Sequence, residues 1–200
     1  MRKVIGITGG IASGKSTICQ YLEGLGYPVI DSDAISRRLS QKGNAIHSAI
    51  LKAFGEEYFL ADGELDRKKL GALIFEDSQS RELLNSVTHP LIVEEIKNLL
   101  QKTKENIIFL DIPLLFEAKL WHLCDTILCV YTDLDTQLNR LMERDKITRE
   151  LALKKIASQM SLEIKRDQSD YVIDSSGPIL STRKQMDELI KQIKGELQNG

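Results

Sequence analysis

Cysteine and long apolar runs are scarce in this chain of 200 residues, and its formal net charge is only −2. The three cysteines, Cys19, Cys124 and Cys129, contain no Cys-x-x-Cys pair, so neither a disulfide framework nor a zinc site is indicated. No stretch approaches the roughly 20 apolar residues that span a bilayer, and the apolar run at 4–8 is too short for a signal peptide. The small net charge argues against broad electrostatic binding to nucleic acid. We therefore expect a cytoplasmic protein that acts on small molecules.

What is present indicates a folded α/β protein. Hydrophobic residues make up 42% of the chain and charged residues 28%, as in ordinary globular proteins. Short runs rich in β-branched and aliphatic residues are typical of strands buried in a parallel sheet. Helix-prone segments separate these runs, which predicts a doubly wound sheet with its ligands at the carboxyl ends of the strands. The predicted strands are 3–8, 29–30, 107–111, 126–131 and 171–174.

Two long helical stretches interrupt the alternation of strands and helices. Residues 34 to about 100 have a helical pattern, with breaks predicted at 42–44, at 61–63 and at the His-Pro pair 89–90. A charged, helix-prone stretch covers 134–167. A last helix is predicted to follow Thr182, because Gln185 completes a capping-box pattern with it.

A glycine-rich turn joins the first predicted strand to the first predicted helix. Residues 9–16 satisfy the G-x-x-x-x-G-K-[ST] pattern of a phosphate-binding loop. Glycines let backbone N–H groups turn toward phosphate oxygens at a helix N-terminus, whose dipole favours anions. Lys15 is expected to reach the β and γ phosphates of ATP, and Ser16 to place its hydroxyl on Mg²⁺. The predicted nucleotide-binding residues are Ile11, Ala12, Ser13, Gly14, Lys15, Ser16 and Thr17.

Two aspartates follow predicted strands at the same edge of the sheet. Asp111 ends an apolar strand and is predicted to bind Mg²⁺ or one of its waters, although it could simply cap the strand end before a proline. Asp33 follows the second strand, where it could orient an acceptor hydroxyl and take its proton. The alternative is that Asp31 or Asp33 is the N-cap of a helix beginning near Ala34.

An arginine pair lies on the predicted helix 134–145. Arg140 and Arg144 are four residues apart, so both face one side of the helix. Such a pair could close over the phosphates as part of a mobile lid and neutralise charge in the transition state. The alternative, which the spacing alone favours, is a solvated face with Glu143 and Asp145 as salt-bridge partners.

Several motifs together resemble the bacterial dephospho-coenzyme A kinases, over nearly every element of the chain. The motifs that carry the resemblance are Ile7–Ser16, Val29–Asp33, Leu65–Arg67, Leu84-Asn85 with His89-Pro90, Asp111–Glu117, Gln137 with Arg140 and Arg144, Gln159, and Asp170–Asp174. The chain departs from the usual family pattern at Ala12, Ser32, Lys155 and Ser175. If the loop needs a positive φ at Ala12, the alanine costs about 1 kcal/mol there. Ser175 leaves the adenine contacts undefined.

The resemblance implies a three-layer P-loop NTPase fold with a central parallel sheet of about five strands. We expect a single kinase unit with a core, a helical acceptor-binding insertion and a helical lid. The core is predicted at 1–33, 105–135 and 168–200, the insertion at about 34–104 and the lid at about 136–167.

The implied reaction is transfer of the ATP γ-phosphate to the ribose 3′-hydroxyl of dephospho-coenzyme A, the final step of coenzyme A biosynthesis, with Mg²⁺. The expected binding partner is this small acceptor, and neither nucleic acid nor a membrane is expected to bind. The protein is expected to be a monomer or a weak homo-oligomer. A nucleoside or nucleoside-monophosphate kinase and a nucleotide-dependent switch are the alternatives. By resemblance, the transfer residues are Asp33, Lys15, Arg140 and Arg144, and the acceptor-binding residues are Asp33, Arg67 and His89.

Overall fold

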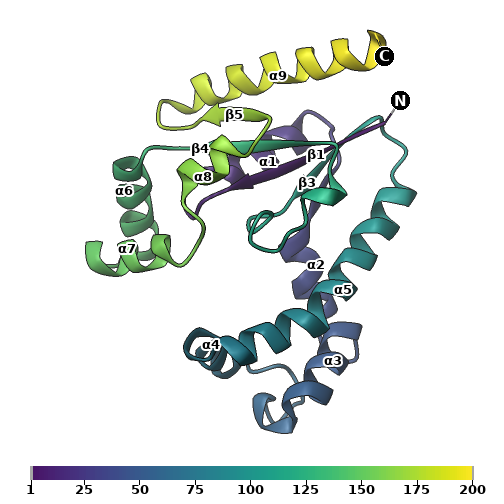
Figure 1. The fold of residues 1–200 in the computed structure, drawn as a ribbon, viewed down its shortest axis with the longest axis vertical. Helices are drawn as coiled ribbons and strands as arrows, with labels where there is room; N and C mark the ends of the chain where they lie inside the picture. The colour runs from purple at the N-terminus through teal and green to yellow at the C-terminus, as the bar shows by residue number, and fades with distance from the viewer. Residues whose placement is uncertain (1, 200) are drawn as a thin grey trace. The chain divides into compact units, whose positions relative to one another are not determined.

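The computed structural model describes residues 2–199 and divides into two compact units (Figure 1). Unit 1 comprises Met1–Ile30 with Thr103–Gly200, and unit 2 comprises Asp31–Lys102. In chain order the elements are β1 (Lys3–Gly9), α1 (Lys15–Gly24), β2 (Val29–Asp31), α2 (Ser32–Leu39), α3 (Ala45–Phe54), η1 (Glu56–Tyr58), α4 (Arg67–Glu76), α5 (Ser78–Lys102), β3 (Ile107–Asp111), η2 (Trp121–Leu123), β4 (Thr126–Tyr131), α6 (Leu134–Asp145), α7 (Arg149–Ala157), α8 (Leu162–Asp167), β5 (Tyr171–Asp174) and α9 (Ile179–Asn199).

The strands form one five-stranded parallel sheet in the order β2-β3-β1-β4-β5. The central strand β1 lies between β3 and β4, with Ile7 opposite both Asp111 and Leu128. Parallel strands bring their carboxyl ends to one edge, so the end of β3 lies beside the start of the glycine-rich turn. The predicted α/β class, the parallel sheet and the strand number are confirmed.

Side chains alternate between the two faces of the central strand. Ile5 and Ile7 are fully buried in a cluster with residues of α1 and α9. The intervening Gly6 faces the other way, where a Cβ would lie 2.8 Å from Leu115 and 2.6 Å from Cys124. The segment after β3 therefore covers that face, which α8 also contacts. Both faces are covered, which is why the strands are continuous apolar runs.

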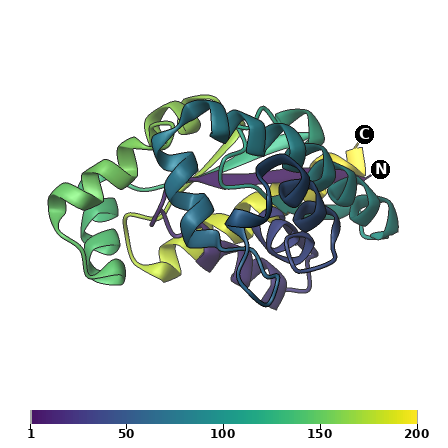
Figure 2. The same ribbon diagram turned by 90° about the horizontal axis from the view of Figure 1, so that it is seen from below.

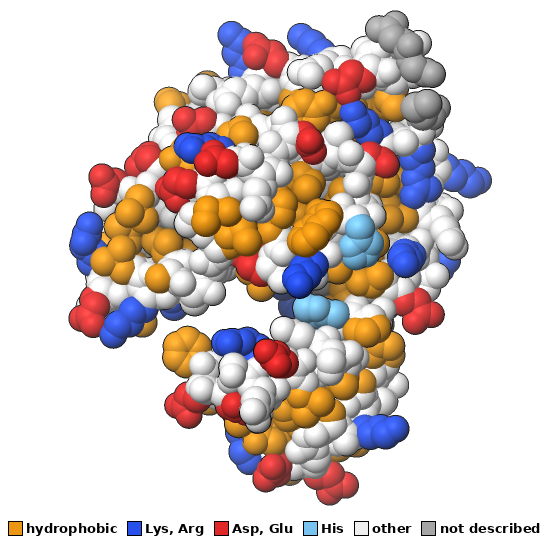
Figure 3. Space-filling view, viewed as in Figure 1, with side chains coloured by type: hydrophobic (Ala, Val, Ile, Leu, Met, Phe, Trp, Pro, Cys, Tyr) orange, Lys and Arg blue, Asp and Glu red, His pale blue; other side chains and the backbone are white. Residues whose placement is uncertain are grey.

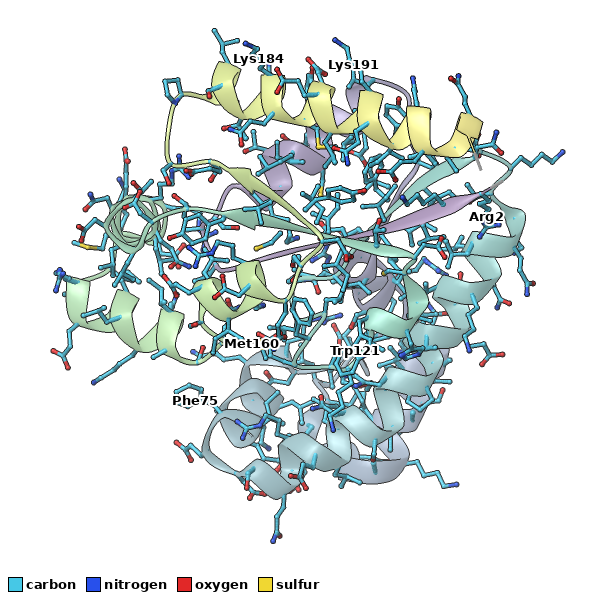
Figure 4. The ribbon with its side chains drawn as sticks, turned by 45° about the horizontal axis from the view of Figure 1, so that its top comes forward. Arg2, Phe75, Trp121, Met160, Lys184 and Lys191 are labelled. Atoms are coloured by element: carbon cyan, nitrogen blue, oxygen red, sulfur yellow. The ribbon has the colours of Figure 1, made fainter. Side chains whose placement is uncertain are left out.

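The last helix, α9, begins earlier than predicted. It starts at Ile179, directly after Pro178, whose fixed φ suits the beginning of a helix. The predicted capping box is therefore wrong: Thr182 is buried within α9, and the amide of Gln185 instead bonds the backbone N–H and C=O of Asp174. Figure 4 shows Lys184 and Lys191 pointing away from the sheet on the outer side of this helix.

Unit 2 consists of helices α2 to α5 around a small apolar core. Its buried residues are Ile46, Ile50, Leu65 and Leu70. The long helix α5 packs against α2, α3 and α4. The predicted break at residues 89–90 is wrong, because α5 runs through Pro90 and bends near its middle (Figure 1). A proline removes one backbone hydrogen bond and kinks a helix, and here the packing of α5 along its length keeps the helix continuous.

The helices α6 and α7 form a hairpin at the carboxyl end of β1, as Figures 1 and 2 both show. Lys146 ends α6 in a left-handed conformation with φ 54°, and the Thr148 hydroxyl caps α7 by accepting from Leu151. The two helices share an apolar cluster of Leu138, Leu141 and Ala152. The prediction of helical structure between residues 134 and 167 is confirmed.

Charges of both signs are interspersed on unit 1. Figure 3 shows acidic and basic side chains mixed over the face of unit 1 that it draws. The described side chains of this face therefore form no broad field of one sign, in keeping with the small net charge of the chain.

Candidate functional site

The glycine-rich turn connects β1 to α1 with two residues in left-handed conformations. Ala12 has φ 58° and Gly14 has φ 85°. Gly14 is the N-cap of α1 and provides no side-chain hydrogen bond to the helix. The Thr17 N–H donates to Gly14 O at 3.0 Å, and the N–H groups of Lys15 and Ser16 lie before it at the positive end of the helix dipole, a position that suits an anion. The positive φ at Ala12 means that the alanine is strained at this position, in the conformation for which a cost is expected at this departure from the family pattern.

The lysine of the turn pairs with the aspartate at the end of β3. Lys15 Nζ donates to Asp111 Oδ1, and the two side chains are 13% and 9% exposed. The Cys19 thiol donates to the other carboxylate oxygen of Asp111 at 3.3 Å. Asp111 thus has a defined orientation and a neutralising partner at the edge of the sheet. Ser16, one residue further along α1, is exposed.

Arg140 is connected to the turn through Ser175, which follows β5. Its guanidinium donates to Ser175 O at 2.7 Å and to Ser175 Oγ at 3.2 Å. The Ser175 hydroxyl in turn donates to Ser13 O at 2.6 Å. The serine at position 175, where the chain departs from the family pattern, therefore links Arg140 of α6 to the phosphate loop.

Arg144 lies apart from this network and belongs to a surface salt bridge. Its Nε donates to Asp145 Oδ1 at 2.8 Å, and Lys155 donates to the other oxygen of Asp145 at 2.8 Å. The hydrogen bonds from Arg144 and then Lys155 lower the pKa of Asp145 to about 2. Of the two arginines, only Arg140 is brought to the loop by the contacts of unit 1.

In unit 2, the question of which aspartate caps α2 has a clear answer. Asp31 Oδ1 accepts from the N–H groups of Asp33 at 2.7 Å and of Ala34 at 3.0 Å, so Asp31 is the N-cap. Asp33 lies in the first turn of α2 with its side chain exposed. The capping alternative therefore applies to Asp31.

The other two residues predicted to bind the acceptor also lie in unit 2. Arg67 is exposed at the start of α4, and its guanidinium donates to Arg37 O at 3.5 Å. His89 lies within α5, where burial lowers the pKa of its imidazole. A neutral imidazole can both donate and accept a hydrogen bond.

A buried lysine that no sequence motif indicates lies close to the start of the turn. Lys165 on α8 is fully buried, and its Nζ donates to Pro113 O at 2.8 Å and forms an ion pair with Glu117 Oε1 at 2.9 Å. It also reaches Gly9 O at 3.5 Å. Glu117 accepts from Met160 N–H at 3.0 Å, in the segment between α7 and α8 that Figure 4 labels at Met160. Lys165 thus joins the start of the loop, the segment after β3 and the helices after β4.

Comparison with known proteins now identifies the family. The sequence model of the family described as Dephospho-CoA kinase matches residues 3–181. The chain belongs to the dephospho-CoA kinase family. Membership makes it an ATP-dependent kinase, and its activity is the phosphorylation of dephospho-CoA in the final step of CoA biosynthesis. The kinase prediction is confirmed.

Curated members of the dephospho-CoA kinase family match almost the full chain. The dephospho-CoA kinase of Bacillus cereus is 45% identical over 195 residues, which cover 96% of this chain and 98% of that protein. The dephospho-CoA kinase of Listeria monocytogenes is 42% identical over the same shares of the two chains.

Solved structures agree with the fold. A Thermus thermophilus crystal structure is 31% identical with a TM-score of 0.83, covering 96% of this chain and 97% of that one. The dephospho-CoA kinase of Campylobacter jejuni is 29% identical with a TM-score of 0.71, over 98% of this chain and 100% of that one. The shikimate kinase of Acinetobacter baumannii, at 16% identity and a TM-score of 0.55 over 98% and 95% of the chains, shares the fold alone.

Along residues 2–199 we find no helix that is both long enough and apolar enough to cross a bilayer.

Proposed function

We propose that this family member transfers the γ-phosphoryl group of ATP to the ribose 3′-hydroxyl of dephospho-CoA through the residues that the sequence selects. The observation that carries this proposal is the buried pair of Lys15 and Asp111 at the edge where the glycine-rich turn leaves β1. Such a pair combines a cation for the transferring phosphates with a carboxylate for the metal.

The proposed ATP-binding part of the site consists of loop residues 11–17, which include Lys15, and of Asp111. The N–H groups at the start of α1 would hold the phosphates, and Lys15 would stabilise the charge that develops on the β and γ phosphates. Mg²⁺ would be held by the Ser16 hydroxyl and, directly or through water, by Asp111, and it neutralises phosphate charge when bound. Residues 2–199 contain no cluster of three or more His, Cys, Asp or Glu side chains suited to a metal. Ser16 and Asp111 offer oxygen atoms, which Mg²⁺ prefers, and Mg²⁺ takes waters and phosphate oxygens as its further ligands.

Asp33 is proposed to act on the acceptor. A hydroxyl is a poor nucleophile, and a carboxylate can orient it and accept its proton late in a loose transition state. Asp33 is exposed in the first turn of a helix that Asp31 caps, so its backbone position is fixed and its carboxylate is accessible. Arg67 and His89 are proposed to bind the acceptor, Arg67 as an exposed cation and His89 as an imidazole whose pKa is lowered by burial.

We further propose that α6 to α8, about residues 136–167, serve as the lid and that residues 34–104 bind the acceptor. Arg140 would contribute positive charge near the phosphates in the transition state, with Arg144 as a second cation on the same helix. The protein is proposed to work in the cytoplasm as a monomer or weak homo-oligomer, without nucleic acid or membrane partners.

Acceptor-dependent release of ADP tests the proposed reaction. Turnover of ATP should be much faster with dephospho-CoA than with nucleoside monophosphates. Equal rates would assign the protein to a nucleoside-monophosphate kinase activity, and slow hydrolysis that no acceptor stimulates would indicate a nucleotide-dependent switch.

Asp33→Asn tests the role of the carboxylate. This change should lower kcat by about 100-fold or more while the dissociation constant for ATP changes little, because the proposed role belongs to the transition state. The chain offers a matched control in Asp135→Asn, since Asp135 follows the N-cap Asp133 of α6 as Asp33 follows Asp31. The control should keep kcat. An unchanged kcat in Asp33→Asn would remove Asp33 from the mechanism.

A further inference from the structure

One residue of the phosphate loop is held from both sides by glutamines from outside the loop. The Ile11 N–H donates to Gln159 Oε1 at 2.9 Å, and the Ile11 C=O accepts from Gln137 Nε2 at 2.7 Å. Gln137 lies in α6, and Gln159 follows the end of α7. We call these two side chains the glutamine bracket.

The glutamine bracket is closely fitted to the loop. Gln137 is only 3% exposed, and a Cβ on Gly10 would lie 2.7 Å from its Nε2, so only glycine at position 10 leaves room for this amide. The side chains of Ile11 and Ala12 also pack against the apolar cluster shared by α6 and α7. The loop is therefore attached to the helical hairpin by both polar and apolar contacts.

The two hydrogen bonds fix two successive peptide planes. In a trans peptide the C=O and N–H point in opposite directions. Gln159 holds the plane between Gly10 and Ile11, whose carbonyl, Gly10 O, accepts from Ser13 N–H at 3.1 Å and closes the turn. Gln137 holds the plane between Ile11 and Ala12, so the Ala12 N–H is directed to the side opposite Gln137.

The two hydrogen bonds to Ile11 matter because the next residue, Ala12, has a backbone conformation that alanine does not favour by itself. Ala12 has φ 58°, which for a residue other than glycine is a disfavoured conformation. An alanine released from its neighbours would leave this region and turn its N–H group elsewhere. Contacts from outside the loop are needed to keep it there, and the glutamine bracket supplies them at the preceding peptide planes.

We propose that Gln137 and Gln159 are positioning residues for phosphoryl transfer. By fixing the two peptide planes on either side of Ile11, they direct the Ala12 N–H toward the phosphates of ATP. This inference rests on the proposed role of the loop in binding ATP. It assigns the helical hairpin a task besides carrying Arg140, because the same hairpin keeps the phosphate loop in shape.

The two glutamines allow a charge-matched test, because one acts as a donor and the other as an acceptor. Gln159→Glu keeps an oxygen that accepts from Ile11 N–H, whereas Gln137→Glu replaces the donor by a carboxylate that faces the Ile11 carbonyl. Both variants add the same negative charge beside the same residue. We expect kcat/KM for ATP to fall about 10- to 100-fold further in Gln137→Glu than in Gln159→Glu, with KM for dephospho-CoA unchanged in both.

Near-isosteric apolar variants complete the design if the buried carboxylate prevents folding. Gln137→Met and Gln159→Met should each lower kcat/KM for ATP by about 10-fold, and Gln159→Glu should recover most of the loss seen in Gln159→Met. Thermal unfolding of each variant reports separately on folding. The affinity for ADP, measured by titration calorimetry, should weaken in the same order as kcat/KM.

Three results would overturn the proposal. Equal losses in Gln137→Glu and Gln159→Glu would show that charge alone is responsible. Methionine variants that lower Tm but keep kcat/KM for ATP would show that the amides serve stability only. Unaltered ADP affinity in every variant would separate the bracket from the phosphates. If the wild-type protein fails to phosphorylate dephospho-CoA, the proposed function fails, whereas ADP affinity still decides the role of the bracket.

Discussion

Lys165→Met should destabilise unit 1 strongly, because it breaks a buried ion pair from one side. The Lys165 side chain is fully buried, with Nζ 2.9 Å from Glu117 Oε1 and 2.8 Å from Pro113 O. Removing it leaves the Met160 N–H donating to Glu117 Oε1, while Glu117 Oε2 is buried without a hydrogen-bond partner. Breaking a buried ion pair from one side costs about 3–5 kcal/mol. Glu117 is 24% exposed, so we expect a value of about 3 kcal/mol.

Urea unfolding monitored by circular dichroism provides the measurement, and for a chain of this size the loss corresponds to a fall in Tm of roughly 6–12 °C. The matched variant Lys165→Met with Glu117→Gln removes both charges and keeps an acceptor for Met160 N–H. This double variant should return to within about 1 kcal/mol of the wild type, because replacing a whole buried pair is often nearly neutral. A loss below about 1 kcal/mol in the single variant, or no recovery in the double variant, would refute the reasoning.

Three further predictions concern the loop and its helices. Ala12→Gly should change the free energy of unfolding by less than about 1 kcal/mol in urea titrations. Relief of the strained φ is offset by the larger conformational entropy of glycine in the unfolded chain and by the loss of methyl packing. A larger change would contradict this balance. Arg140→Met should lower kcat about 100-fold in ADP-release assays. Arg144 pairs with the neighbouring Asp145, so Arg144→Met should lower kcat much less. The reverse order would contradict the site as described. Hydrogen bonds from the backbone N–H and the hydroxyl of Thr136 lower the pKa of Asp133 to about 2, so its stabilisation of α6 is complete above about pH 4 and disappears as the pH falls toward 2. Asp133→Ser, which caps without titrating, should flatten that part of the stability curve, and an unchanged curve would assign the acid sensitivity elsewhere.

The sheet and the phosphate loop were predictable from the sequence because their signals are local. Strands buried on both faces are short apolar runs, and β3, β4 and β5 begin and end where such runs do. The loop combines a fixed glycine spacing with a strand before it and a helix after it. The ends of helices were harder, as the start of α9 shows, since Pro178 and the packing of Thr182 outweigh a capping pattern.

The contacts that join distant segments could not be read from the sequence. Lys165 is one lysine within a charged helical stretch, and only the folded chain shows it buried against Glu117. Gln137 and Gln159 are spaced as in the family, but their shared attachment to Ile11 depends on how α6 and α7 return to the loop. The spacing of Arg140 and Arg144 predicts one shared helix face, and the structure distinguishes the two side chains through Ser175. Such roles follow from tertiary packing, which a local pattern does not encode.

The position of the new phosphate in the product tests the central claim most directly. Wild-type protein incubated with ATP, Mg²⁺ and dephospho-CoA should form one equivalent of ADP and a product that mass spectrometry and ³¹P NMR identify as carrying a phosphate monoester on the ribose 3′-oxygen. CoA, whose 3′-oxygen already bears a phosphate, should give no ADP above background. Phosphate at another position, or equal ADP formation with CoA as the acceptor, would contradict the account.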